Sequence, residues 1–107
     1  MDIYCIDEHD RQWVEYEGLG PTGIRVKPLT AGVDTCARIA FIEYPPGYAD
    51  DIHHHEESEV FLVSEGMLSL DGTAYGPGSI LCIPRDQDYA LHAGPDGARY
   101  FRIWNVA

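Results

Sequence analysis

The chain of 107 residues is long enough for one domain that buries roughly two thirds of the surface its unfolded form exposes. Its hydrophobic content of 45% excludes an intrinsically disordered chain. A net charge of −11, with only seven Lys and Arg residues, would repel a polyanion, so we expect neither nucleic acid nor a membrane surface as a partner.

Short extended segments separated by Gly and Pro follow one another along the chain. The turns recur at intervals of about ten residues, and no segment combines a helical period with an N-cap. This spacing is typical of an all-β sandwich or barrel. The strands are predicted at 12–18, 23–29, 35–44, 60–66, 67–72, 73–76, 79–84, 88–94 and 98–106. Asp71 and Gly72 predict a two-residue hairpin turn with positive φ at both positions.

Three consecutive histidines precede the apolar segment at 60–66. Side chains alternate across a strand, so His53 and His55 would share one face, with Cα atoms roughly 6.6 Å apart, while His54 points the other way. Two imidazoles placed in this way can converge on one metal ion. The same spacing on a helix would turn them apart, so the pair indicates an extended segment.

Glu59 is the third candidate ligand. It would lie roughly 13 Å from His55 in a continuous strand, which is too far to share an ion. A chain reversal at 56–58 would bring the carboxylate beside the two imidazoles. Two His and one carboxylate form a facial set that leaves metal positions open. By composition alone, the same stretch could also be a solvated polar loop.

These residues resemble the first motif of the cupin superfamily, G-x5-H-x-H-x3-E-x6-G. Gly47, His53, His55, Glu59 and Gly66 match every fixed position of the motif. The chain is similar, over about 13–104, to small cupins related to the ChrR-type metal-binding domain and to acetylacetone and dihydroxyacetophenone dioxygenases. The resemblance implies a single cupin domain over 1–107, a double-stranded β-helix or jelly-roll barrel with one divalent metal at its mouth.

The second cupin motif departs from the family pattern. Gly78 and Pro84 match, but Asp86 stands where glycine is expected. Tyr89 stands where the family has its fourth metal ligand, a histidine, and Ala93 where it has asparagine. The fourth ligand is therefore missing from its usual position.

Two side chains are candidates to replace it. His92 follows three residues after the vacant position, but strand parity puts it on the opposite face, so only a β-bulge would turn it to the metal. Tyr89 could bind the metal after losing its proton. It could also stay protonated and donate a hydrogen bond to the substrate.

The family resemblance leads us to expect an enzyme. Iron, manganese, nickel or zinc at His53, His55 and Glu59 would act on a small organic substrate, either with dioxygen or as a Lewis acid in an isomerase or lyase reaction. Tyr89 would donate to a developing oxyanion. Arg38 or Arg102 would anchor an acidic substrate if the strand turns them inward.

Two alternatives remain open at this stage. The protein could be a non-catalytic sensor that binds a metal or small ligand, as ChrR-type cupins suggest, although we expect no attached anti-sigma segment. It could also be a degenerate cupin without metal.

An exposed edge strand leads us to expect a homodimer. The absence of a signal-peptide pattern, with three cysteines in no ligand pair, leads us to expect the cytoplasm.

Overall fold

The computed structural model describes residues 3–18, 20–33 and 37–105. In this part of the chain nearly all regular structure is β, and one 3-10 turn spans Glu8–Asp10. No helix there could cross a membrane. The strands are β1 Val14–Gly18, β2 Gly20–Pro28, β3 Arg38–Tyr44, β4 Glu59–Leu70, β5 Thr73–Tyr75, β6 Ile80–Ile83 and β7 Leu91–Trp104.

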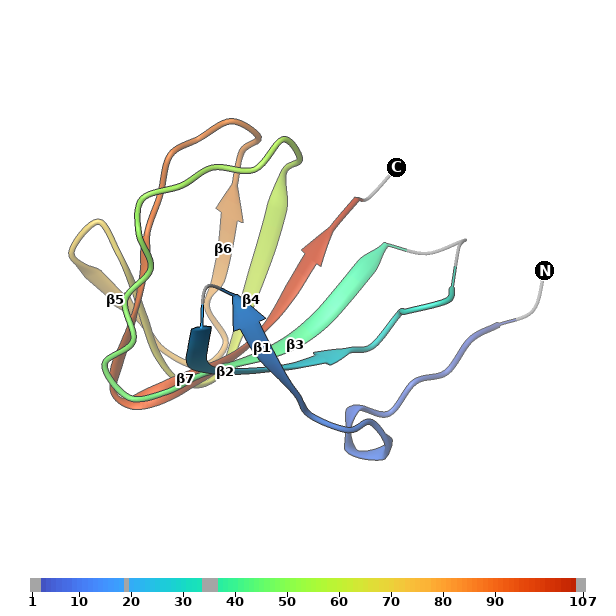
Figure 1. Cartoon of the computed structure of the whole chain (residues 1–107). Helices are drawn as coiled ribbons and strands as arrows, with labels where there is room; N and C mark the ends of the chain where they lie inside the picture. The colour runs from blue at the N-terminus through green and yellow to red at the C-terminus, as the bar shows by residue number, and fades with distance from the viewer. Residues whose placement is uncertain (1–2, 19, 34–36, 106–107) are drawn as a thin grey trace.

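The strands form one antiparallel sheet that curls on itself. Its order is β1-β2-β3-β7-β4-β5, and β6 also pairs with β4. Figure 1 shows the two longest strands, β4 and β7, at the centre, with β3 and β2 continuing on one side. Antiparallel pairing of strands that are joined by Gly- or Pro-containing turns produces this arrangement, and the predicted jelly-roll cupin barrel is confirmed.

Two pairs of predicted strands merge into single long strands. Segments 60–66 and 67–72 form most of β4, and segments 88–94 and 98–106 are joined in β7. Gly66 pairs with Ala98 and Leu68 with Ala93, so one residue of β4 faces four residues of β7. The predicted break between strands at 95–97 is therefore wrong, because these residues form a bulge that bends β7 without ending it.

Glycine is required at Gly66, where β4 pairs with β7 beside the bulge. Gly66 has a φ of 72°, and a Cβ at this position would overlap the carbonyl oxygen of Gly97. The predicted hairpin turn after β4 is confirmed, because Asp71 and Gly72 have φ values of 51° and 81°. The hairpin turn follows from local backbone geometry, whereas the need for glycine at Gly66 also depends on the close approach of β7.

The hydrophobic core fills the inside of the curled sheet. Its most buried side chains are Phe61, Val63, Leu68 and Leu91. The outer face of β3 and β7 has a separate aromatic cover, in which Trp13 stacks on Phe41 with ring centroids 5.4 Å apart.

The connection between β3 and β4 runs back along the start of β7 (Figure 1). The amide of Ala93 donates to the carbonyl of Tyr48, and the amide of Asp50 donates to that of Leu91. His53 and Tyr89 exchange two backbone hydrogen bonds, of 3.0 and 2.8 Å. These bonds hold the histidine segment over the inside of the barrel.

Candidate metal centre and cavity

The histidine segment keeps its alternation without being a regular strand. His53 forms an isolated bridge with Tyr89, and His54 and His55 lie outside any strand. The amide of Asp86 donates to the carbonyl of His55 and fixes the end of the segment. His53 and His55 are half-buried and line the main cavity, whereas His54 is exposed. The ring centroids of His53 and His55 are 5.1 Å apart.

Glu59 is the first residue of β4 and is 2% exposed. The chain reversal predicted before it brings its Oε1 to 3.4 Å from Nε2 of His55. Its other oxygen, Oε2, accepts a hydrogen bond of 2.8 Å from Nε of Arg102. Oε1 is buried and has no hydrogen-bond partner among the described residues. The carboxylate is therefore fixed by Arg102 with one oxygen free.

Both imidazoles can offer a nitrogen lone pair. Nδ1 of His53 lies 2.7 Å from the carbonyl oxygen of Asp51, which can only accept, so Nδ1 donates and Nε2 is left free. Burial lowers the pKa of His55, although the Glu59 carboxylate opposes this effect. A lowered pKa favours the neutral imidazole, the form that binds metals.

Tyr89 occupies the position of the missing histidine and faces the same site. Its ring centroid is 4.5 Å from that of His53 and 6.1 Å from that of His55. Burial, and next the Glu59 carboxylate, raise the pKa of Tyr89 well above its ordinary value. The hydroxyl therefore stays protonated and suits a hydrogen-bond donor better than a metal ligand.

The imidazoles and Tyr89 open into a cavity of about 410 Å³ inside the barrel. This volume falls within the range of small-molecule sites. Its wall combines aromatic and aliphatic side chains and carries two charged ones, Asp50 and Arg102. Glu59 lines a smaller adjoining cavity of about 290 Å³, which shares His55 and Arg102 with the first. The aromatic lining residues are Tyr16, Tyr44, Tyr48, Phe61, Tyr89, Tyr100 and Trp104.

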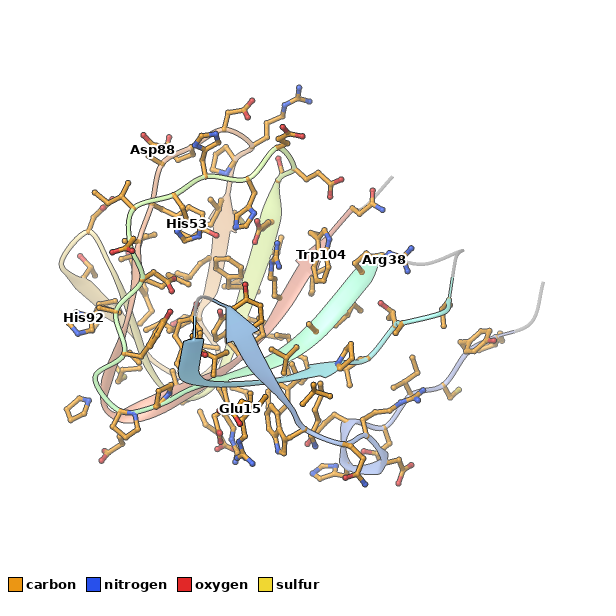
Figure 2. The ribbon with its side chains drawn as sticks, viewed as in Figure 1. Glu15, Arg38, His53, Asp88, His92 and Trp104 are labelled. Carbon is orange, nitrogen blue, oxygen red and sulfur yellow. The ribbon has the colours of Figure 1, made fainter. Side chains whose placement is uncertain are left out.

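The structure brings Arg102 to this site but leaves two other candidates outside it. Arg102 lines the cavity and pairs with Glu59. Arg38 starts β3 on the same face and pairs with Trp104, but it does not line the cavity, and its Nη1 donates to the carbonyl of Val33. His92 is exposed between buried Leu91 and Ala93, and Figure 2 shows it away from His53. Normal alternation in β7 therefore turns its ring outward, and no bulge re-aims it.

Sequence reasoning missed the polar group at the other side of the cavity. Asp50 accepts a hydrogen bond of 3.0 Å from the hydroxyl of Tyr44, whose ring centroid lies 4.7 Å from that of Tyr48. Tyr44 contacts Tyr100 edge to face, with ring centroids 5.2 Å apart. No motif marks Asp50, because its position depends on the connection that pairs with β7.

The donor set fits one divalent transition metal. The free oxygen of Glu59 and the ring nitrogens of His53 and His55 are the ligand types that such ions use. Among the described residues, no three His, Cys, Asp or Glu side chains are already converged on one point. His55 and Glu59 form the closest part of the set, and His53 would complete it by a side-chain adjustment.

Comparison with known proteins identifies the family of this chain. The ChrR cupin-like domain family matches residues 2–102. Dimethylsulfoniopropionate lyase DddW of Ruegeria pomeroyi is 30% identical over 92 residues, which are 78% of this chain and 60% of the lyase. The chain therefore spans less than two thirds of that curated relative.

Two solved structures share the fold. One is the anti-sigma factor ChrR in complex with SigE of Rhodobacter sphaeroides, with a TM-score of 0.74, 22% identity, and coverage of 90% of this chain and 50% of the other. The second is the polyketide cyclase RemF of Streptomyces resistomycificus, with a TM-score of 0.78, 20% identity, and coverage of 96% and 79%. Together with the barrel and the family match, these results show that the chain belongs to the ChrR cupin-like family.

Proposed function

We propose that this protein is a mononuclear metal-dependent enzyme that acts on a small organic molecule, with His53, His55 and Glu59 as the metal ligands. The observation that carries the proposal is the buried Oε1 of Glu59, which has no partner among the described residues and lies 3.4 Å from Nε2 of His55. Leaving such an oxygen unsatisfied costs roughly 1–3 kcal/mol, and a bound cation would remove that cost.

The surrounding residues support catalysis rather than metal storage. Iron, manganese, nickel or zinc bound there would supply Lewis-acid chemistry or activate dioxygen. Arg102 holds Glu59 in one orientation, and the protonated hydroxyl of Tyr89 can stabilise a developing oxyanion. The aromatic side chains of the cavity offer apolar surface against which a small organic molecule can pack.

The similarity to DddW favours Lewis-acid chemistry of the lyase or isomerase type over dioxygenase chemistry. DddW is named as a lyase of dimethylsulfoniopropionate, a small organic molecule. The cavity of about 410 Å³ has room for a molecule of that class. Oxygen uptake during turnover separates the two reactions, because lyase or isomerase turnover consumes no oxygen. Uptake equal to substrate loss would favour the dioxygenase.

Metal content after purification without chelator tests the ligand set. His53→Ala and His55→Ala should each lose most of the metal, because a site with three protein ligands has none to spare. His54→Ala is the matched control and should retain it, since its ring is exposed and lies near Asp88 instead. Equal metal loss in His54→Ala and His55→Ala would identify a surface chelator and refute the proposed site.

Tyr89→Phe separates a metal ligand from a donor to substrate. The variant keeps the ring contacts with His53 and removes the hydroxyl. We expect metal content to persist while the turnover rate falls by roughly 10²-fold or more, as for loss of one oxyanion donor. Loss of metal from this variant would instead make Tyr89 the fourth ligand.

A second candidate function is a non-catalytic sensor that signals metal or small-ligand binding to a partner protein. The family match to ChrR cupins and the structural likeness to ChrR, solved in complex with SigE, favour it. Metal binding without turnover of any small organic acid, ketone or diketone would favour the sensor.

We also propose that the protein is a homodimer and that it works in the cytoplasm. We propose no nucleic-acid partner, because the net charge of −11 would repel a polyanion.

A further inference from the structure

The cavity carries a carboxylate that the metal site does not use. Asp50 is half-buried and lines the cavity with Tyr44, Tyr48 and Tyr100. Tyr44 donates to its Oδ2 at 3.0 Å, and the Tyr48 ring packs beside that of Tyr44. The backbone amide of Asp50 donates to the carbonyl of Leu91, so the residue is fixed at both its backbone and its side chain.

The donors around Asp50 leave its charge unbalanced. The Tyr44 hydroxyl that donates to it is neutral, and the other charged residue on the cavity wall, Arg102, is already paired with Glu59 at 2.8 Å. Burial raises the pKa of Asp50, and the nearby hydroxyls and His53 only partly oppose this effect. A cation placed in the cavity would supply the missing countercharge.

The two sides of the cavity therefore differ in charge. The side with His53, His55 and Arg102 would be positive when a divalent metal is present, and suits a carboxylate or carbonyl oxygen. The side with Asp50 is negative, and aromatic rings lie around it. A carboxylate with aromatic neighbours is the combination that binds ammonium and other onium groups.

We propose that Asp50 and its tyrosines form a subsite for the positively charged end of a small substrate, whose oxygen-bearing end lies toward His53 and His55. The ligand class is a short zwitterion, with an onium group at one end and a carboxylate at the other. This inference rests on the proposed function, because it takes the cavity as the substrate site.

The test compares two probes of equal shape by isothermal titration calorimetry. One probe is trimethylammoniopropionate, and the other is its isostere with a quaternary carbon in place of the nitrogen. The wild-type protein should bind the cationic probe about tenfold more tightly or better. Asp50→Asn should abolish this preference. Asp51→Asn makes the same charge change at an exposed neighbour and should keep it.

Tyr44→Phe provides a second test if Asp50→Asn folds poorly. It removes the hydrogen bond to Asp50 but keeps the aromatic ring, so the cation preference should fall severalfold. Equal affinity for both probes in the wild type would overturn the inference. So would a preference that persists in Asp50→Asn, a Tyr44→Phe variant with the full preference, or no binding of either probe in the millimolar range.

Titration of both probes into the metal-free and the zinc-loaded protein distinguishes failure of the proposed subsite from failure of the proposed function. A wild-type protein that binds metal at His53 and His55 without any cation preference would overturn the subsite alone. A protein that prefers the cationic probe but binds no metal would overturn the metal-dependent reaction and leave the subsite standing. Asp50→Asn should keep the wild-type metal content, because Asp50 is not a proposed ligand.

Discussion

Replacing Arg102 by leucine should destabilise the metal-free protein strongly. The Glu59 side chain is 1% exposed, and its contact with Arg102 is its one ion pair with a Lys or Arg among the described residues. Removing one partner of a buried pair costs about 3–5 kcal/mol. The Arg102 side chain is 26% exposed, and solvent therefore weakens its ion pair with Glu59. The substitution also removes the contact between the guanidinium group and the Trp104 ring. We expect a loss of roughly 2–4 kcal/mol.

Urea unfolding followed by tryptophan fluorescence measures this loss. For a chain of this size, a change of 2–4 kcal/mol should lower the midpoint by roughly 1–3 M. The double variant Glu59→Leu with Arg102→Leu should recover most of the loss, because no charge is left buried without a partner. Saturating zinc should also reduce the difference in urea midpoint between wild type and Arg102→Leu, because the bound ion would supply positive charge beside Glu59.

Two outcomes would refute this reasoning. A loss below about 1 kcal/mol in Arg102→Leu would mean that Glu59 is solvated or protonated rather than held as a buried anion. A double variant as unstable as the single one would mean that packing of the arginine, and not its charge, is responsible.

Two further predictions concern the scaffold. Gly66→Ala should cost roughly 3 kcal/mol or more, because its Cβ would overlap backbone, whereas Gly47→Ala, with open space at its Cβ position, should cost only about 1 kcal/mol; equal midpoints in thermal unfolding would contradict this. Arg25, followed by Arg99, lowers the pKa of Glu43 below its ordinary value of 4.5. The ionised Glu43 carboxylate therefore stabilises the fold above pH 4.5, and this stabilisation fades as the pH falls through the lowered pKa. Glu43→Gln should lower the free energy of unfolding at pH 7, and the difference from wild type should disappear in acid.

The local features of the site could be predicted from sequence. The outward turn of His54 and the inward turn of His53 and His55 follow from backbone alternation, and they persist although the segment is not a regular strand. The approach of Glu59 to His55 follows from the reversal before β4. Asp86 stands at a motif position expected to be glycine and adopts a φ of 61°, so the backbone requirement remains although the residue type differs.

The remaining features depend on long-range pairing. Gly94 and Gly97 indicate a turn in the sequence. Pairing with β4 on both sides of them makes this segment a bulge within β7 instead of the end of a strand. Asp50 meets Tyr44 only because the connection between them folds back beside β7. Arg38 and Arg102 share inward parity, but Arg102 pairs with Glu59 and lines the cavity, whereas Arg38 bonds to the carbonyl of Val33.

An anomalous-difference map from zinc-loaded crystals tests the metal centre most directly. The proposed function predicts one peak per chain, about 2.0–2.2 Å from the Nε2 atoms of His53 and His55 and from Oε1 of Glu59. Arg102 should remain bound to the other oxygen of Glu59. A map without a peak at this position, or with its strongest peak at exposed His54 and Asp88, would contradict the proposed metal centre.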